Sequence, residues 1–106
     1  MLRFLLHYGI HILVPIGIAL AFYPSQRIRA ALILLAGFLL DVDHLWADPV
    51  FDPDRCSIGF HVLHSYIAIA LYTALLFSKK LRIIGLACLV HMAADAVDCL
   101  FILNAA

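Results

Sequence analysis

Glutamate is absent from this chain of 106 residues, and charged residues of every kind are scarce. All seven acidic residues are aspartates, and charged residues make up only 13% of the sequence. So few charges could not cover the surface of a soluble domain. The lack of glutamate also disfavours the di-iron bundles, which bind their metals through glutamates and Glu-x-x-His motifs.

An excess of positive charge is missing as well, because seven basic residues balance the seven aspartates. This balance argues against nucleic acid as a partner. The three cysteines form an odd count without a Cys-x-x-Cys pair, so no disulfide framework is expected. We interpret Cys88 and Cys99, which lie too far apart in one predicted helix to pair with each other, as small apolar side chains. Cys56 lies in a loop, where it is either free, oxidised or linked to a second copy of the chain in a homo-oligomer.

Apolar residues are abundant: they make up 66% of the chain, against roughly 45–50% in soluble domains. The mean hydropathy is +1.07. Four segments approach the roughly 20 apolar residues that a membrane-spanning helix needs. They cover residues 2–23, 27–46, 60–78 and 81–103. The sequence therefore predicts a single all-α domain, residues 1–106, built as an antiparallel bundle of four transmembrane helices in contact with membrane lipid.

The basic residues are distributed unevenly between the two ends of these segments. Five of the seven follow the first segment or separate the third from the fourth: Arg27, Arg29, Lys79, Lys80 and Arg82. The positive-inside rule makes that side cytoplasmic. Both termini and the long loop after the second segment are then expected to face outward. Arg3 and Arg55 are the two exceptions.

A signal peptide is a possible alternative for the first segment, because Ala19-Leu20-Ala21 fits the small-residue cleavage pattern. However, only Arg3 precedes the apolar run, and the run is long for a signal peptide. Cleavage would also remove His7 and His11. We therefore expect the first segment to be retained as a membrane helix.

Histidine and aspartate are nearly the only polar side chains in the apolar segments, and each segment carries a group of them. The groups are His7 and His11; Asp41, Asp43 and His44; His61 and His64; and His91, Asp95 and Asp98. Most spacings are three, four or seven residues, which places the members on one face of a helix. Ionisable residues inside a bilayer are costly and rare, so they are functional candidates.

All four groups fall in the same, outward half of the predicted bundle, which indicates a single site near the outer membrane face. Imidazole and carboxylate ligands suit zinc, and also manganese, iron or cobalt. A structural zinc ion typically takes four ligands, so this larger set indicates two or three ions. The predicted metal ligands are His7, His11, Asp41, Asp43, His44, His61, His64, His91 and Asp95.

Three residues are candidates for catalytic roles near these ligands. Asp43 does not share a helix face with Asp41, so we also expect it to hydrogen-bond to a metal ligand and orient it. Asp43 or Asp98 would orient a water molecule or act as a base, and Tyr66 would donate a hydrogen bond. In the alternative interpretation the histidines are hydrogen-bonded core residues. Aspartate near a helix C-terminus opposes the helix dipole, which makes that alternative weaker for the second group.

The order of these motifs resembles a known family. Asp41-Val42-Asp43-His44, His64-Ser65 and His91-x3-Asp95 are similar to motifs of the small bacterial inner-membrane, metal-dependent hydrolases regulated by LexA. Residues 55–61 and 63–65 resemble a related uncharacterised family of short four-helix membrane proteins. The ligand pattern is similar to that of zinc-dependent phospholipase C and P1 nuclease, which hold three metals in a helical fold. Before the third segment this chain lacks the Arg and Thr of the hydrolases' His-Arg-Gly-x-Thr-His-Ser.

The resemblance implies a membrane-embedded, metal-dependent hydrolase that acts on a phosphoester of a lipid or lipid-linked substrate. In that interpretation Arg55 contacts an anionic substrate; otherwise it is a surface charge. The alternative is a membrane metal-binding protein, such as a metal carrier, donor or sensor, without hydrolase activity. A transporter is disfavoured, because an ion path should carry ligands through both halves of the bilayer.

Overall fold

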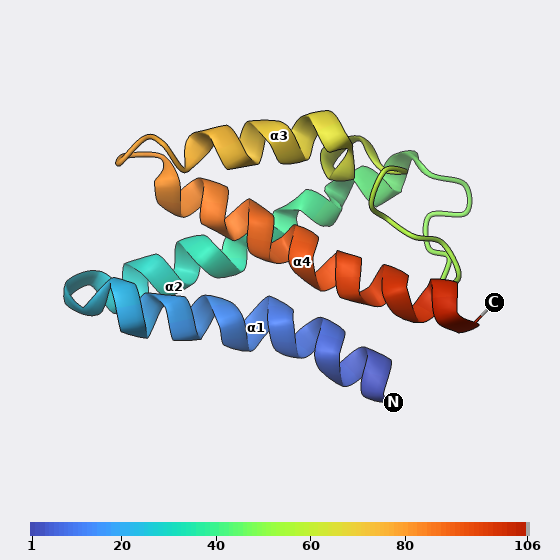
Figure 1. Cartoon of the computed structure of the whole chain (residues 1–106), viewed down its shortest axis with the longest axis horizontal. Helices are drawn as coiled ribbons and strands as arrows, with labels where there is room; N and C mark the ends of the chain where they lie inside the picture. Colours follow the sequence, from blue (N-terminus) through green and yellow to red (C-terminus); the bar gives the residue numbers. More distant parts are fainter. Residues whose placement is uncertain (106) are drawn as a thin grey trace.

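The chain folds into four α-helices joined by turns and 3-10 segments, as a computed structural model shows (Figure 1). The structure describes residues 1–105, and no β-strand occurs among them. The all-α prediction is therefore confirmed. The molecule measures 44 × 29 × 21 Å, and the four helices lie roughly along its longest axis (Figure 1).

The first and last helices are the longest elements. α1 spans Leu2–Phe22 and α4 spans Arg82–Ala105, close to the predicted segments 2–23 and 81–103. Both are long and apolar enough to cross a membrane by length and composition. They pack against each other along the molecule. His7 and His11 on α1 are thereby brought opposite Asp95 on α4.

The second predicted segment is helical throughout but changes its winding half-way. α2 covers Arg27–Leu35, and the 3-10 helix η2 continues from Ala36 to Trp46. A Cβ atom added to Gly37 would lie 2.7 Å from the carbonyl oxygen of Ala87, so η2 packs unusually close to the backbone of α4. In a 3-10 helix residues three apart eclipse each other. Phe38, Asp41 and His44 therefore line up along one side of η2.

The third segment is shorter than predicted. α3 covers only Tyr66–Leu75, and the 3-10 turn η3, Val62–His64, precedes it. Ser65 caps α3, because its side chain accepts a hydrogen bond from the backbone N–H of Ala68 at 3.1 Å. His61 and His64 thus lie before the helix rather than on its first turn. Ser65 is the sequence signal for this later start.

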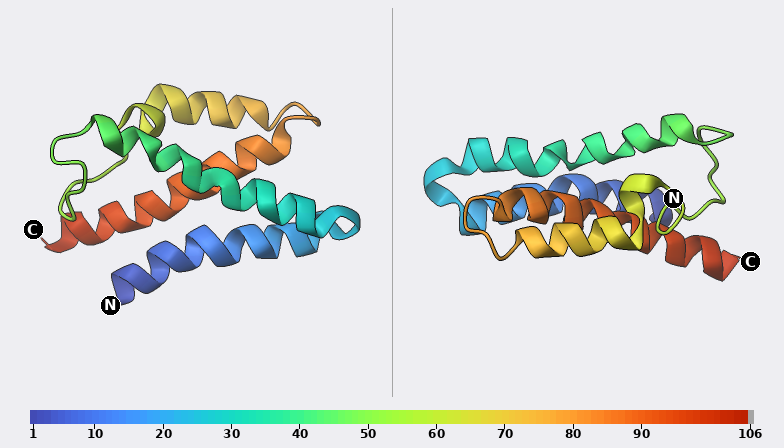
Figure 2. Two further views of the ribbon diagram at one scale, coloured as in Figure 1. Left: turned by 180° about the vertical axis from the view of Figure 1, so that it is seen from behind. Right: turned by 90° about the horizontal axis from the view of Figure 1, so that it is seen from above.

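The two ends of the bundle have different cores. Ala19, Ala30, Leu34 and Ala87 form an apolar cluster at the end where α1 turns into α2. Small residues at such contacts let helices approach closely. At the other end the buried side chains are mostly histidine and aspartate. Figure 2 shows α2 and η2 crossing over α4 toward that polar end.

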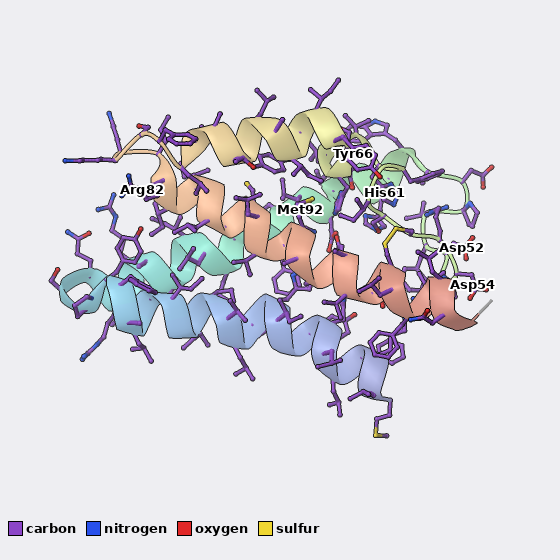
Figure 3. All side chains as sticks on the ribbon, in the orientation of Figure 1. Asp52, Asp54, His61, Tyr66, Arg82 and Met92 are labelled. Atoms are coloured by element: carbon purple, nitrogen blue, oxygen red, sulfur yellow. A yellow bond between two sulfur atoms is a disulfide. The ribbon has the colours of Figure 1, made fainter. Side chains whose placement is uncertain are left out.

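A disulfide between Cys56 and Cys99 ties the long loop to α4 (Figure 3). The interpretation of Cys99 as only a small apolar side chain was therefore wrong, and Cys56, which the sequence left either free or oxidised, is paired within the chain. The partner was not evident, because it depends on how the loop folds back over α4. Cys88 is free, and it does not pair with Cys99, as expected.

Candidate metal centre

The histidines and aspartates from four segments meet at one end of the bundle. They form three groups whose ligand atoms lie within 4.8 Å of one another inside each group. The central group contains Asp41, His64, His91 and Asp95; one flanking group contains His7, His11 and Asp95; the other contains Asp43, His44 and His61. Together these are the nine residues predicted as metal ligands. The structure brings all of them together.

The central group draws its side chains from three different elements. Asp41 comes from η2, His64 from η3, and His91 and Asp95 from successive turns of α4. His91 Nε2 lies 3.0 Å from His64 Nε2, 3.0 Å from Asp41 Oδ1 and 3.3 Å from Asp95 Oδ2. His64 Nε2 lies 2.8 Å from Asp95 Oδ2 and 3.6 Å from Asp41 Oδ1. Four potential ligand atoms thus converge on one point.

These separations fit a single tetrahedral ion. With zinc–ligand distances of about 2.0–2.1 Å, the ligand atoms of a tetrahedral site lie about 3.3 Å apart. The observed separations, from 2.8 to 3.6 Å, bracket that value. His64 and His91 are fully buried, whereas the side chain of Asp41 is 41% exposed. The group is therefore closed on the protein side and open through Asp41.

Hydrogen bonding at His64 indicates which of its nitrogens would bind a metal. Its Nδ1 lies 2.8 Å from Asp43 Oδ2, which also accepts from the backbone N–H of Leu63 at 2.9 Å. A neutral imidazole has one N–H, and the carboxylate holds it on Nδ1. The lone pair of Nε2 then points at the carboxylates of the central group. A cation between them would relieve that repulsion, as in carboxylate–histidine–zinc arrangements.

Buried polar atoms without a hydrogen-bond partner are a further indication that these groups bind cations. Five buried side-chain atoms between residues 1 and 105 lack a hydrogen-bond partner: His11 Nε2, Asp43 Oδ1, His61 Nε2, His91 Nδ1 and Asp95 Oδ2. All five belong to the three groups. Buried polar atoms are nearly always paired in native proteins. Their concentration here supports bound cations, although His91 Nδ1 faces away from the convergence point of its group.

Asp95 joins the central group to the first flanking group. Its Oδ2 lies in the central group, and its Oδ1 lies 3.6 Å from His11 Nε2 and 3.8 Å from His7 Nδ1. The two histidines come from successive turns of α1, as the i,i+4 spacing predicted. One carboxylate thus faces two potential ion positions, which is the arrangement of a bridging ligand.

Asp43 plays the corresponding part on the other side. Its Oδ1 lies 3.3 Å from His44 Nδ1, and the rings of His44 and His61 stack with centroids 4.0 Å apart. His61 lies in the loop before η3. Burial, followed by the neighbouring His44 imidazole, lowers the pKa of His61 below its ordinary value. The neutral imidazole that binds metals is thereby favoured.

A pocket of about 420 Å³ opens onto the three groups. Its walls come from α1, η2, the long loop and α4, and its lining includes Asp41, His44, His61 and Asp95. Two cationic side chains, Arg3 and Arg55, also line it. The Arg55 guanidinium lies 4.7 Å above the ring of Phe60 and donates to the carbonyl oxygen of Val50. The pocket therefore combines ligand groups at its base with positive charge.

One family model matches the chain, and the match covers residues 1–102. That model describes a family of unknown function, DUF6122. The chain belongs to DUF6122. No curated protein and no solved structure matches it. The geometry of this DUF6122 chain therefore carries the functional argument by itself.

Two of the predicted catalytic residues of the DUF6122 chain lie outside the ligand groups. Asp98 lines the pocket, but both of its carboxylate oxygens pair with the guanidinium of Arg3. Tyr66 is 74% exposed, packs beside Gly59 and does not line the pocket (Figure 3). The structure thus gives Asp98 an ion-pairing role and leaves Tyr66 on the outer surface.

The pocket of this chain also contains residues that the sequence analysis did not assign to the site. Phe38 lines it one 3-10 turn before Asp41, and its ring lies 4.5 Å from that of His11. Arg3 is the more informative omission. It lies at the end of the molecule that the positive-inside rule leaves poor in basic residues, and this exception was the signal for its pairing with Asp98.

Proposed function

We propose that this chain is a membrane-embedded, metal-dependent hydrolase that acts on a phosphoester of a lipid or lipid-linked substrate. The observation that carries the proposal is the central group, where Asp41, His64, His91 and Asp95 present four ligand atoms to one point at the base of a pocket. The two flanking groups supply places for one or two further ions. The motif resemblance to the LexA-regulated membrane hydrolases agrees with this proposal.

Membrane insertion is supported by the outer surface of the bundle. Large apolar side chains point away from it along every helix, including Phe22 at 75% exposure, Ile28 at 73%, Ile67 at 77% and Leu103 at 67%. Water would make such a surface unfavourable, whereas lipid tails would solvate it. α1 and α4 suit full spans. We infer that α2 with η2, and η3 with α3, form the other two passes of a four-helix bundle.

The orientation of the bundle follows from two independent features. The five basic residues in or next to the α1–α2 and α3–α4 turns lie at the end away from the metal groups, which supports a cytoplasmic location for that end. The Cys56–Cys99 disulfide lies at the opposite end, and disulfides persist in oxidising compartments outside the cytoplasm. Both features direct the pocket and both termini outward, as in a bacterial inner-membrane protein with an outward-facing site.

Zinc is the ion that the ligands suit best. Imidazole and carboxylate at tetrahedral spacing are typical zinc ligands, and manganese, iron and cobalt accept the same donors. The carboxylate of Asp95 faces two of the three groups. We therefore propose two ions that share this carboxylate, and the group of Asp43, His44 and His61 would hold a third.

The chain's own residues would organise the hydrolysis around these ions. A bound zinc ion lowers the pKa of water toward about 7 and supplies hydroxide at neutral pH. Asp41 is partly exposed at the base of the pocket, so it marks where substrate meets the ligand groups. Arg55 and Arg3 would hold the negative phosphoryl oxygens. Asp98, once released from Arg3, would accept a proton, and Asp43 would hold His64 in the tautomer that binds metal.

Elemental analysis and an activity assay on the same preparation test this proposal. Protein without a histidine tag, purified in mild detergent, should contain two or three zinc equivalents and hydrolyse bis(p-nitrophenyl) phosphate or phosphatidylglycerol. Asp41→Asn and His91→Ala should lose zinc, and turnover should fall by more than about 100-fold, since even outer-shell changes cost 10–100-fold. Asp54→Asn, an exposed aspartate outside the groups, is the matched control and should retain both properties.

The outcomes separate the hydrolase from its alternative. Full zinc in both Asp41→Asn and His91→Ala would remove these residues from the ligand set. Stoichiometric zinc without turnover on either substrate would favour a metal donor or sensor. Absence of zinc, manganese, iron and cobalt alike from the wild-type protein would overturn the metal centre itself.

A further inference from the structure

A second pocket lies at the end of the molecule opposite to the metal groups. It has a volume of about 270 Å³ and forms where the turn between α1 and α2 meets the turn between α3 and α4. Its lining residues are Tyr23, Gln26, Arg29, Ala30, Ile33, Lys79, Lys80 and Ile83. In Figure 3 the nearby Arg82 lies at this end, whereas Asp52 and Asp54 lie at the other.

Positive charge collects around this pocket without acidic neighbours. Arg29, Lys79 and Lys80 line it, and Arg27 and Arg82 lie next to it in sequence. All seven aspartates lie between Asp41 and Asp54 or on the second half of α4. Within residues 1–105 none of the three lining cations forms an ion pair; Arg29 contacts only the side-chain oxygen of Gln26, at 3.4 Å. The pocket therefore has uncompensated charge to offer an anion.

The shape and surroundings of the pocket indicate which anion. Its floor includes the buried Ala30 and the half-buried Ile33 and Ile83, so it is apolar beneath a cationic rim. Phe22 and Phe77, near the same two turns, are 75% and 87% exposed and would face lipid tails. A free phosphate ion would use only the rim. A phospholipid would place its phosphate at the rim and its glycerol and upper acyl chains along the apolar surface.

We propose that this pocket binds the headgroup of an anionic phospholipid from the leaflet on the cytoplasmic side. Basic pockets between membrane helices on that side are suited to such headgroups. The inference rests on the membrane placement in the proposed function, but not on the metal centre or on hydrolysis. Because the pocket lies at the far end of the bundle, its lipid is a bound partner and not the substrate.

Two double variants with equal loss of charge test this assignment. Arg29→Gln with Lys80→Gln removes two cations from the pocket, whereas Arg27→Gln with Arg82→Gln removes two cations just outside it. Each protein, in mild detergent, is titrated with phosphatidylglycerol or phosphatidylcholine and observed by native mass spectrometry. The wild type should retain phosphatidylglycerol in preference to phosphatidylcholine. The pocket variant should bind phosphatidylglycerol about 30-fold more weakly, since each cation near an anionic lipid is worth roughly 1 kcal/mol.

The control variant should change phosphatidylglycerol binding far less. Equal weakening in both double variants would show a diffuse charge effect and overturn the pocket. Equal retention of the two lipids by the wild type would overturn it as well. Inorganic phosphate is the competing probe: displacement of phosphatidylglycerol at equal concentration would show a phosphate site and contradict the lipid assignment.

Two further readouts keep this result separate from the proposed function. Zinc content of the Arg29→Gln, Lys80→Gln protein should match the wild type, because the metal groups lie at the other end. A protein that retains zinc but shows no preference for phosphatidylglycerol would overturn the lipid pocket and leave the proposed metal centre standing. Extraction of the wild-type protein from membranes by salt without detergent would contradict membrane insertion, and the lipid pocket would fail together with it.

Discussion

Asp43 is fully buried, and its two carboxylate oxygens serve two different histidine groups. Oδ2 holds the N–H of His64 and that of Leu63, whereas Oδ1 faces His44 without a hydrogen-bond partner. The first contact orients a ligand of the central group. The second offers a ligand atom to the flanking group. A single side chain thus couples the central group to one flanking group, in the way that Asp95 couples the central group to the other.

Replacing Asp43 by asparagine should weaken metal binding at the central group. An amide oxygen in the place of Oδ2 would keep the contacts to Leu63 and His64 only as a weaker, uncharged acceptor, whereas an NH2 group there would lose both and favour the His64 tautomer with the proton on Nε2. That tautomer has no lone pair for a metal. Zinc affinity, measured by competition with a chelator, should fall by about 10–100-fold.

The same substitution at Asp54 provides the comparison for this change. Asp54→Asn should leave the chelator competition unchanged, because Asp54 is exposed and belongs to none of the groups. If Asp43→Asn binds zinc as tightly as Asp54→Asn does, the carboxylate of Asp43 neither sets the tautomer of His64 nor acts as a ligand.

At the scale of elements, η2 is the part of the fold that brings Asp41 to the α4 ligands. Its tight winding aligns Phe38, Asp41 and His44 along the pocket, and Gly37 permits the close approach to α4. An α-helix over the same residues would rotate Asp41 and His44 relative to each other by a different angle. The winding of this segment therefore matters as much as its residue types.

Gly37→Ala should push η2 away from α4. The added Cβ would lie 2.7 Å from a backbone oxygen of Ala87, which cannot move aside as a flexible side chain would. Overpacking of this kind costs about 1–3 kcal/mol of stability. Asp41, one turn further on, would shift from its partners on α4. Thermal unfolding in detergent should show a lower midpoint, and zinc per chain should decrease.

Gly17→Ala is the matched control for this change. No atom lies within 4 Å of the position that its Cβ would take, so the substitution should be neutral or slightly stabilising for α1. Similar melting temperatures and zinc contents for the two alanine variants would show that the close approach at Gly37 is dispensable.

The Cys56–Cys99 disulfide also shapes the site, because it fixes the loop that forms one wall of the pocket. The two cysteines are 43 residues apart in sequence. For a loop of this length, the chain-entropy model gives a stabilisation of up to about 4 kcal/mol. Cys56→Ser with Cys99→Ser, or reduction of the wild type, should lower the free energy of unfolding by about 2–4 kcal/mol in denaturant titrations.

Cys88→Ser provides the reference for the loss of a thiol. Cys88 is free and lies away from the loop, so its replacement should have a small effect, and its unfolding should remain sensitive to reductant. An unfolding curve of the wild type that is identical with and without reductant would show that the loop is held by other contacts, such as that of Arg3 with the carbonyl oxygen of Pro53.

Part of this architecture could be predicted from sequence because it depends on local pattern. The apolar runs of α1 and α4 set their lengths, and the spacing of His7 from His11 and of His91 from Asp95 placed each pair on one helix face. The groups on the two middle segments were found by residue type. Their backbone was not predicted, since η2 and η3 depend on contacts with α4 and on the cap at Ser65.

Other features depend on contacts between distant segments, which a single sequence does not specify. The pairing of Arg3 with Asp98 joins the two termini, and the disulfide depends on the path of the loop. Tyr66 was assigned to the site because it follows the His-Ser pair. With α3 starting at Tyr66 itself, its side chain points outward instead.

At the scale of the whole molecule, charge is divided between the two ends of the bundle. The cytoplasmic end, as we propose it, carries five basic residues and no aspartate. The other end carries all seven aspartates and all six histidines, together with Arg3 and Arg55. Such a distribution couples the proposed function to topology: the end with the candidate metal ligands is the end poor in basic residues, which the positive-inside rule directs outward.

Labelling of introduced cysteines should therefore give opposite results at the two ends. In a Cys88→Ala background, where Cys56 and Cys99 remain paired, Val50→Cys should react with a membrane-impermeant maleimide in intact cells. Gln26→Cys should react only after permeabilisation. Both positions are exposed, so a lack of labelling reflects the membrane and not burial. The background protein alone should remain unlabelled.

The reverse pattern would place the metal groups in the cytoplasm. The pocket would then face soluble substrates and a reducing compartment, in which the Cys56–Cys99 bond would not be maintained. Labelling at both positions in intact cells would mean that the two ends share one side of the membrane, and the four-pass bundle would have to be abandoned. Labelling at position 50 alone is the result that supports a site open to the outer leaflet, because only that orientation satisfies the basic turns and the disulfide together.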